Sequence, residues 1–588
     1  MLLLVIGLLN GHVFGGQNDS KTESSKGSYE QRMEQLIGDE LSGTVQTIEQ
    51  DVYGKGAAMR IIAGQDLDKA NEVLLSVASW FDRPHPHGRM LDGEPDFAAA
   101  LLCRVYYLTH ESKNLYPETK TAIENFFTEY DYKSIFPSEN HYLLFRSSRY
   151  LMASILGDPS KGGVFRVRFN AYRDEAIALK IKDEYWLKDF LTFRAEKGWG
   201  EFDSTVYMIA DWECLVNLYD YAPSSEIRQL AKANMDLILL GLALNSVDGI
   251  YGGAHGRSSI KSSFDHRRSN AYALNYLYFG NCMPKGMRCA VVYGSEYRAP
   301  ELLVEFANSK RPAYVNRERK HLHNVVDARP YKPLDGSIRK YTYVSPGYVM
   351  GCVQFQDEYP KGHECAWYAN HQQQHWDLSF TGGGTSLRVF ANHPSHASDQ
   401  NMGNYWAGST GHFFQQENVL VALYEIPKEM HYQMIHAYFP RKLFDEVVEK
   451  KGWLFGRFAD SAVALKFSAP YHWVEDGKYA GLEVVSNGNK HALICETRAL
   501  DDMTFNGFID EVLKNTISFN AESMELTYRS KAEGTLSINT KGKRELNGKA
   551  LDLDYPSFAS PYAYSSWGSG KVKFDFNGKN VMLGIKGE

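Results

Sequence analysis

Hydrophobic residues in the first half of the chain recur at intervals of three and four, whereas those in the second half alternate with polar residues. The first pattern buries one face of a helix and the second buries one face of a strand. The first pattern predicts helices over 31–50, 65–82, 94–109, 118–128, 139–156, 166–190, 204–221, 224–244, 267–280 and 299–309. No fixed repeat length relates these segments, so helix hairpins closing into a ring are favoured over a regular solenoid.

The alternating pattern begins near residue 335. Gly, Asn and Asp interrupt it at short intervals, as is typical of antiparallel strands joined by turns. It predicts strands within 341–355, 419–426, 453–458, 462–467, 491–497 and 572–576, with a last hairpin over 568–588. We therefore predict a multidomain chain with a helical toroid over 30–325 and an antiparallel β-sandwich over 326–588. The basic, proline-containing segment 310–335 is the predicted connector.

The N-terminus carries a short apolar run followed by small residues. This is typical of a secretory signal peptide, although no Lys or Arg precedes the run. We predict a signal peptide over 1–16, a flexible polar leader over 17–29, and a secreted or periplasmic protein. The run is too short to span a bilayer, and no other stretch is long enough.

Composition narrows the choice of partners. The 588 residues carry a net charge of −7, so there is no basic excess and nucleic acid is not an expected partner. Aromatic residues make up 13% of the chain, which suits stacking on sugar rings as well as packing within β-domains. The seven cysteines are odd in number and widely spaced, so we expect them to be buried and reduced.

A candidate reactive stretch runs from Gly198 to Tyr221. Glu201 and Asp203 lie in a glycine-containing loop, and Ser204 is a favourable N-cap for the helix that follows. Tyr207 is then expected in the first turn, near the mouth of any cleft. The alternative is a packing tyrosine whose hydroxyl is tied to a neighbour.

Asn140 and His141 form a second candidate, at the start of a predicted helix. An Asn amide donates to a carboxylate, and His donates, accepts or titrates near neutral pH. The alternative is that Asn140 is a helix cap and His141 a partly buried hydrogen-bonding residue.

The loop 251–257 forms a third candidate and contains His255 and Arg257. Its glycines allow close approach of a ligand, and the Arg fork suits both oxygens of a carboxylate. The alternative is a solvated loop. A phosphate-binding loop is excluded because its glycine spacing and its Lys are absent.

A fourth candidate lies in the β half. His371, His375 and Asp377 share one face if the segment is a strand, so they can form a metal site; otherwise the strand presents His371 to a facing cleft. Tyr405 and Trp406 lie just beyond and are predicted to stack on a sugar.

Together these stretches resemble the heparinase II/III-like and alginate-lyase-like polysaccharide lyases. Asn140-His141 is similar to their Asn-Asn-His stretch, and the Glu-Phe-Asp-Ser-x-x-x-Tyr segment is similar to their second motif. The His-rich segment before Ser379 resembles their third. Three features depart from the pattern: Glu139 precedes Asn140, the sheet motif reads His-x-x-x-His, and the loop of His255 has no counterpart.

The resemblance implies an (α/α) toroid followed by a β-sandwich, and β-elimination on uronic-acid polymers without a required cofactor. It implies that Asn140 and His141 neutralise the uronate carboxylate. It also implies that Tyr207 protonates the leaving oxygen and, in some substrates, removes the C5 proton as well. It also implies a sheet-domain base, either His371 or His375. The chemistry itself requires no redox cofactor, and a divalent metal, if one binds, is expected to be structural. His255 is a competing base, and Glu201 and Arg257 are further substrate-binding candidates.

Two other function classes stay open. A glycoside hydrolase needs two carboxylates on either side of the bond, for which Glu139, Glu201 and Asp203 are available. A glycan-binding protein would hold an acidic polymer without turnover. The sequence does not identify the polymer, the endo or exo mode, the general base or the oligomeric state.

Overall fold

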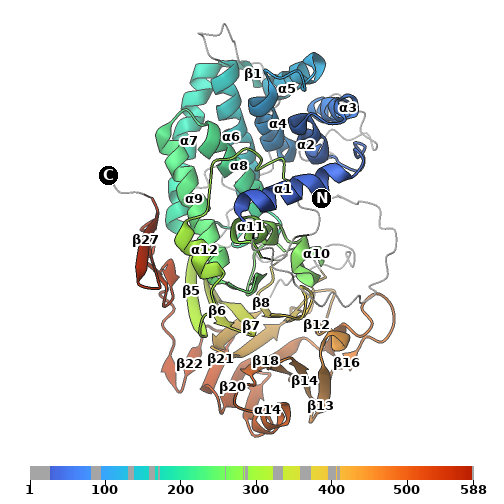
Figure 1. Ribbon diagram of the computed structural model, residues 1–588. Helices are drawn as coiled ribbons and strands as arrows, with labels where there is room; N and C mark the ends of the chain where they lie inside the picture. Colours follow the sequence, from blue (N-terminus) through green and yellow to red (C-terminus); the bar gives the residue numbers. More distant parts are fainter. Residues whose placement is uncertain are drawn as a thin grey trace.

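The computed structural model describes residues 27–80, 95–129, 138–157, 166–169, 172–258, 260–281, 284, 289–321, 336–357, 373–394, 405–406 and 411–585. Helices dominate the chain before Tyr314, and strands dominate it from there onward (Figure 1). The predicted order, with a helical half followed by antiparallel sheets, is confirmed. The predicted signal peptide and most of the predicted leader lie outside the described residues.

The first half is built from helices that contribute side chains to one core, apart from the short helix that ends at Phe264; that side chain belongs to a separate cluster. They are α1 (Tyr29–Ser42), α2 (Lys55–Ala63), α3 (Leu67–Ala78), α4 (Asp96–Thr109), α5 (Pro117–Glu129), α6 (Glu139–Leu156), α7 (Ala176–Lys197), α8 (Met208–Tyr221), α9 (Ser225–Leu244), α10 (Ile260–Phe264), α11 (Asn270–Phe279) and α12 (Glu301–Ala307). Helix α6 contacts α4, α7 and α8, and α9 contacts α7 and α8. The segments 64–66 and 222–224 are short, so α2 packs against α3 and α8 against α9 as antiparallel hairpins.

Several predicted helix boundaries were wrong. Helix α1 begins at Tyr29, capped by Ser28, so the predicted leader ends earlier than residue 29. The short helix α2 was missed because its nine residues, between two left-handed glycines, carry too little periodicity. The predicted helix 166–190 opens instead with a hairpin of β1 (Arg166–Phe169) and β2 (Tyr172–Glu175).

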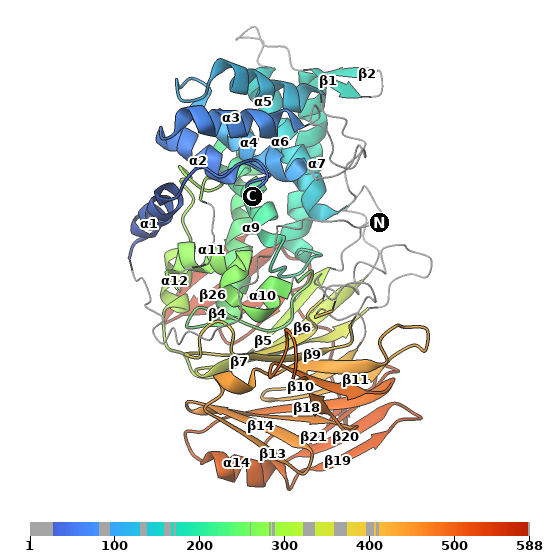
Figure 2. The same ribbon diagram turned by 90° about the vertical axis from the view of Figure 1, so that its right-hand side faces the viewer.

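Three antiparallel sheets form most of the second half (Figure 2). The largest has the order β16-β17-β12-β9-β8-β7-β6-β5-β24-β25-β26-β27, the second β10-β11-β18-β15-β14-β13, and the third β19-β20-β21-β22-β23. The strands are β5 (Tyr314–His321), β6 (Ser337–Ser345), β7 (Tyr348–Gln356), β8 (Trp376–Phe380), β9 (Arg388–Asn392), β10 (His412–Gln416), β11 (Val419–Glu425), β12 (Met434–Tyr438), β13 (Glu446–Lys450), β14 (Trp453–Phe458), β15 (Ser461–Phe467), β16 (His472–Trp473), β17 (Glu483–Asn487), β18 (Lys490–Ala499), β19 (Thr516–Asn520), β20 (Glu525–Ser530), β21 (Gly534–Asn539), β22 (Arg544–Leu546), β23 (Lys549–Ala550), β24 (Phe558–Ala559), β25 (Ala563–Ser565), β26 (Lys571–Phe576) and β27 (Lys579–Gly584).

The sheets stack in layers with an apolar core in each interval. One core joins side chains of the first and second sheets, and another joins the second sheet, the third sheet and helix α14 (Phe505–Val512). The predicted sandwich is therefore extended by a third layer. Alternate residues of the middle sheet face opposite cores: Leu420 and Ala422 of β11 pack towards the first sheet, whereas Val419 and Val421 pack towards the third.

The junction between the halves starts earlier in the chain than predicted. Strand β5 begins at Tyr314, inside the segment 310–335 that was expected to be a connector. The Tyr314 hydroxyl donates to the carbonyl of Leu244 at the end of α9. The predicted last hairpin is confirmed as β26–β27, and β27 contacts α9 and α12. Both ends of the sheet half are thus fastened to the helices.

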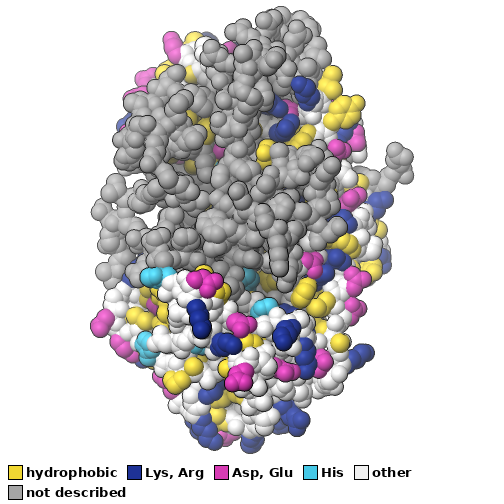
Figure 3. All heavy atoms as spheres, turned by 180° about the vertical axis from the view of Figure 1, so that it is seen from behind, with side chains coloured by type: hydrophobic (Ala, Val, Ile, Leu, Met, Phe, Trp, Pro, Cys, Tyr) yellow, Lys and Arg dark blue, Asp and Glu magenta, His cyan; other side chains and the backbone are white. Residues whose placement is uncertain are grey.

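Among the described residues, no helix combines the length and the apolar character needed to cross a bilayer. Figure 3 shows Lys/Arg and Asp/Glu side chains interspersed over the visible part of the sheet half. Cys103, Cys214, Cys289, Cys352 and Cys495 are buried and form no disulfide, as predicted for these five.

Candidate active site

The loop between α7 and α8 is anchored by a buried carboxylate. The backbone N–H groups of Gly200 and Glu201 donate to Glu139, at 3.0 and 2.6 Å. Arg194 completes this arrangement with an ion pair of 3.0 Å to Glu139. Glu139 is the first residue of α6, so its carboxylate joins the start of α6 to the loop.

Asn140 and His141, the next two residues of α6, have fixed orientations. The Oδ1 of Asn140 accepts from the Ser138 hydroxyl at 2.6 Å, and its Nδ2 donates to Glu201 Oε2 at 2.7 Å. His141 Nδ1 contacts the carboxylate of Asp96, and Phe97 packs edge-on to the imidazole with ring centroids 5.2 Å apart. The amide and the imidazole are therefore held without relying on a ligand.

Tyr207 lies at the N-cap of α8, one residue before the helix rather than in its first turn as predicted. The difference arises because the Ser204 hydroxyl accepts from the N–H of Tyr207, at 2.9 Å, and so caps a turn that precedes the helix. Tyr207 is half-buried, and its ring stacks on Phe97 at a centroid distance of 6.4 Å. Its position at the end of an element leaves part of the side chain accessible.

Arg257 connects Tyr207 to Glu201. Its Nη2 donates to the Tyr207 hydroxyl at 3.0 Å, and its Nη1 donates to Glu201 Oε1 at 2.8 Å. The guanidinium carbon lies 4.5 Å from the centroid of the Tyr207 ring. With the amide of Asn140 on the other oxygen of Glu201, these four side chains form one continuous chain of hydrogen bonds.

His255, two residues before Arg257, is placed differently. Its backbone pairs with Gln374 through two hydrogen bonds of 2.9 Å, which joins the loop to the sheet half. Its ring is 1% exposed and packs on Tyr251, and neither ring nitrogen has a hydrogen-bond partner of good geometry. Burial, followed by the charges of Lys340 and Arg388, lowers the pKa of His255 well below its usual range. The imidazole is therefore neutral at neutral pH.

Asp377 forms a buried ion pair instead of a metal ligand set. Its Oδ2 accepts from the Arg388 guanidinium at 2.5 and 2.7 Å, and its Oδ1 accepts from Ser379 and from the Gly253 backbone N–H. Burial raises the pKa of Asp377, and the charge of Arg388 opposes that rise. This pair fastens the loop 251–257 to the sheet.

His375 does not share a face with Asp377, contrary to the prediction. The segment is not a regular strand at this point, and Gln374 rather than His375 reaches the Asp377 carboxylate, at 3.4 Å. His375 packs against Phe413 at 5.3 Å, and burial lowers its pKa to about 4. Within the described ranges no group of three His, Cys, Asp or Glu side chains could hold a metal ion. His371 lies outside the described residues.

The prediction that Tyr405 and Trp406 stack on a sugar is not supported by their positions. Trp406 is 0% exposed and its ring stacks on His436 at 4.1 Å. The Tyr405 hydroxyl donates to Glu483 at 2.8 Å. Both aromatic side chains fill a cluster with Phe264, so packing within the protein uses the faces that a sugar would need.

The site also contains residues that the sequence did not single out. Asp96 and Phe97, at the start of α4, contact His141 and Tyr207. An acid in the first turn of a helix was the only available signal, and many helices share it. Lys320 and Lys340, both buried, bind the carboxylate of Asp203. The available signal was a charged residue at a position where the alternating pattern of a strand predicts a buried side chain.

Comparisons with known proteins add little beyond this geometry. The sequence matches no protein-family model and no curated protein sequence. Among solved structures, heparinase III is 11% identical over 92% of this chain and 84% of its own, with a TM-score of 0.37. A Streptomyces coelicolor A3 chondroitin AC lyase in complex with chondroitin sulphate is 10% identical over 89% and 86%, with a TM-score of 0.41. A chondroitinase AC lyase with bound oligosaccharides is 10% identical over 95% and 96%, with a TM-score of 0.39.

Proposed function

We propose that this chain is a polysaccharide lyase that cleaves a uronic-acid polymer by β-elimination. The observation that carries the proposal is the Tyr207 hydroxyl, bound by Arg257 in a hydrogen-bonded chain that ends at Asn140. His141 lies beside that chain, linked to Tyr207 through Phe97. Donors for a carboxylate and a positioned proton donor are the groups that this reaction requires.

In the proposed reaction, Asn140 and His141 donate hydrogen bonds to the uronate carboxylate. This spreads the negative charge that develops when a base removes the proton at C5. The C4–C5 double bond forms as the bond from C4 to the glycosidic oxygen breaks, and Tyr207 transfers its proton to that oxygen. One proton is removed and one is delivered, and no redox cofactor is needed.

Arg257 and Glu201 prepare the acid for that step. The Arg257 guanidinium stabilises the phenolate that forms once the Tyr207 proton has left, because a cation that donates to the oxygen favours the charged form. Glu201 holds Arg257 and orients Asn140, whose Nδ2 has a second hydrogen for a substrate oxygen. Asn140 and His141 are 1% and 4% exposed, so neighbouring side chains move when a carboxylate reaches them.

Four groups are candidates for the base: Tyr207, His255, His371 and His375. Tyr207 acts alone if it collects the C5 proton and returns it to the leaving oxygen. The His255 ring is neutral, but burial and the charges of Lys340 and Arg388, which lower its pKa, also weaken it as a base. Substituting each His by Gln separates the candidates, because loss of the base abolishes elimination and loss of a packing residue does not.

The hydrolase alternative is less well supported. Burial alone would raise the pKa of Asp203, but attraction by Lys320 and Lys340 outweighs it and holds this pKa well below the usual range. Asp203 therefore cannot keep the proton that a general acid must deliver. Glu201 is occupied by Arg257 and Asn140.

The test is absorbance of the conjugated unsaturated uronate in the ultraviolet while purified protein is incubated with a panel of uronate polymers. We expect a rise with wild type and none with Tyr207→Phe, which removes only the hydroxyl. The matched control is Tyr297→Phe, which removes a buried hydroxyl that donates to Asp236 at 2.9 Å, and it should retain activity.

New reducing ends without an increase in absorbance would contradict elimination and favour hydrolysis. Binding of a polymer without either product would favour the glycan-binding alternative.

The proposal includes an acidic polysaccharide as the partner and a secreted or periplasmic location. Fractionation of the producing cell tests the location.

A further inference from the structure

Four buried charged side chains meet where the loop before Tyr207 contacts the sheet half. The two oxygens of Asp203 accept from Lys320 and Lys340, one from each ammonium group. Lys320 also lies 2.9 Å from Glu318. Their side chains are between 1% and 10% exposed. Two carboxylates thus balance two ammonium groups, and we call this set the junction ion cluster.

The sheet presents its three members of the cluster on one face. Glu318 and Lys320 are two residues apart on β5, and Lys340 on β6 is directly opposite Glu318. Asn245, at the end of α9, donates to Glu318 at 2.6 Å. Two paired strands and the end of a helix therefore hold the three members of the cluster that lie outside the loop.

Asp203 is fixed within the loop by more than its charge. Its backbone is left-handed, with φ of 52°, a conformation that non-glycine residues adopt rarely. The carbonyl of the preceding Phe202 accepts from the Gly256 N–H at 2.7 Å. A Cβ at Gly256 would lie 3.1 Å from the Phe202 backbone, so the two loops approach closely.

Asp203 and Lys320 keep their charges around neutral pH. Burial opposes ionisation of Asp203 and Lys320, yet their mutual attraction lowers the pKa of the acid and raises the pKa of the base. Removing one carboxylate leaves a buried ammonium group with half of its compensation, and such a group is strongly unfavourable in an interior. The cluster therefore favours the observed loop position over any position that withdraws Asp203.

We propose that the junction ion cluster positions the loop 198–207 so that Glu201 and Tyr207 stand correctly against Arg257. Asp203 is a positioning residue: it lies two residues after Glu201 and four before Tyr207, and contacts the sheet rather than the substrate. Through this cluster the sheet half contributes to catalysis. The inference rests on the proposed lyase function for its kinetic consequence, but its structural consequence is independent of that function.

The structural test is hydrogen exchange of Asp203→Asn, followed by mass spectrometry of peptides over the loop. Asn tolerates the left-handed backbone and keeps the shape of Asp, so the variant removes mainly charge. We expect exchange of the loop 198–207 to be at least about ten-fold faster than in wild type, because opening of a segment is governed by its local stability.

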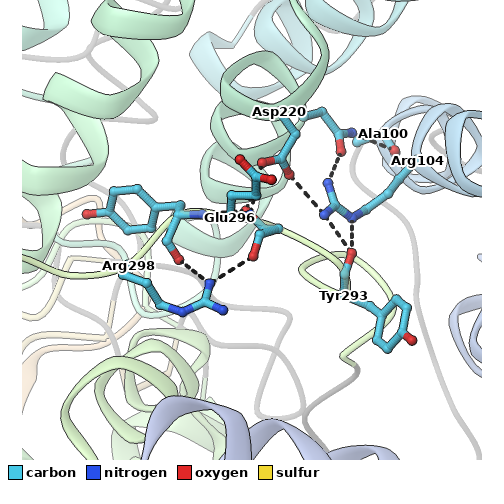
Figure 4. A network of polar contacts seen from close by, with 9 residues as sticks. Ala100, Arg104, Asp220, Tyr293, Glu296 and Arg298 are labelled. Carbon is cyan, nitrogen blue, oxygen red and sulfur yellow. Dashed lines mark hydrogen bonds and ion pairs between the residues drawn. The ribbon is translucent and has the colours of Figure 1, made fainter.

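The matched control is Asp220→Asn, at the other end of α8. Figure 4 shows Asp220 with Arg104, which also binds the carbonyl of Tyr293. The Arg104–Asp220 distance is 3.0 Å and both side chains are buried, but neither contacts the loop. This variant should speed exchange near its own ion pair and leave the loop 198–207 unchanged.

The kinetic test compares the same two variants on a polymer that wild type cleaves. Asp203→Asn should lower kcat by about 100-fold with KM changed less than about three-fold, since a small misplacement of a catalytic group costs this much. Asp220→Asn should keep kcat within about three-fold of wild type at a temperature where both are folded. If Asp203→Asn does not fold, the charge-balanced double variant Asp203→Asn/Lys340→Met replaces it.

Unchanged exchange and kcat in a folded Asp203 variant would overturn the inference. Equal effects of both variants on the loop would also overturn it, because the cluster would then contribute only general stability. Faster loop exchange in a protein whose wild type shows no elimination would instead leave the positioning intact and refute the lyase proposal.

Discussion

The two regions with chemically promising sequences behave in opposite ways. In the helical half, Asn140, Glu201 and Tyr207 come from element ends and loops and converge into one hydrogen-bonded cluster with Arg257. In the sheet half, His375, Tyr405 and Trp406 instead pack against other side chains of the protein. The comparison teaches that polar residues at the ends of different elements can lie close enough to form a site. The three residues of the sheet half are instead buried within the packed protein.

Trp406→Ala tests whether this residue of the sheet half serves packing, and it is expected to have the largest effect on stability. Removing a fully buried indole that stacks on His436 should lower the free energy of unfolding by about 3–5 kcal/mol. Denaturant unfolding measures this loss. KM for the polymer should not change at a temperature where the variant is folded; a KM raised at unchanged stability would restore Trp406 as a sugar-binding residue.

Arg257→Gln is expected to have the next largest effect, this time on rate. It removes the donor to the Tyr207 hydroxyl and the partner of Glu201, and loss of one such electrostatic group lowers kcat by about 10²–10³-fold. Initial rates of elimination measure it, with Arg267→Gln as control, since Arg267 contacts Thr385 and Asp265 instead. Equal rates of elimination for both variants would show that Arg257 has no specific role in catalysis.

Sequence patterns predicted the two halves of the fold well because burial of one face imposes a period on a helix or a strand. They failed at α2, which is too short to show a period, and at the third sheet, because alternation does not say how many layers stack. Element boundaries shifted where a side chain outside the period decided them, as Ser204 did before α8.

For the site, the sequence indicated Asn140, Glu201, Tyr207 and Arg257, which the structure brings together. It could not predict which oxygen or nitrogen each would bind, because those contacts depend on the relative placement of α6, α8 and a distant loop. Lys320 and Lys340 were missed for the same reason: their partner Asp203 lies more than a hundred residues away.

Asp211→Asn tests how the charges of Glu139 and Glu201, in the candidate active site, affect the protonation of a buried carboxyl group. Burial, then the charges of Glu139 and Glu201, raises the pKa of Asp211 well above its usual range, so the folded protein keeps this carboxyl protonated. The unfolded chain ionises near its ordinary pKa of about 4, so the residue contributes stability below that pH and loses it as pH rises. Asn, of similar shape, removes this dependence.

We therefore expect Asp211→Asn to be more stable than wild type at pH 7, with the difference shrinking towards pH 4. Each unit by which the folded pKa exceeds the unfolded one corresponds to about 1.4 kcal/mol. Thermal unfolding across this pH range measures it. A variant that is less stable at pH 7 would mean that Asp211 is ionised and bound in the folded protein.

His255→Gln is expected to have the smallest effect, and it has the opposite pH dependence. Because burial holds the pKa of His255 below the unfolded value of about 6.5, its stabilising contribution is present above that pH and is lost as pH falls. The loss reaches at most about 1.4 kcal/mol per pH unit. His255→Gln should therefore reduce the acid sensitivity of the unfolding temperature below pH 6.5.

The same variant decides whether His255 belongs with the catalytic cluster or with the packed residues. If its neutral ring only fills the junction beside Tyr251, elimination at pH 8 should stay within about three-fold of wild type. If His255 removes the C5 proton, elimination is lost at every pH while the folded protein persists, since Gln cannot accept that proton. The second outcome would add His255, which pairs with the sheet half, to the catalytic residues. It would also show that a buried imidazole acts as the base.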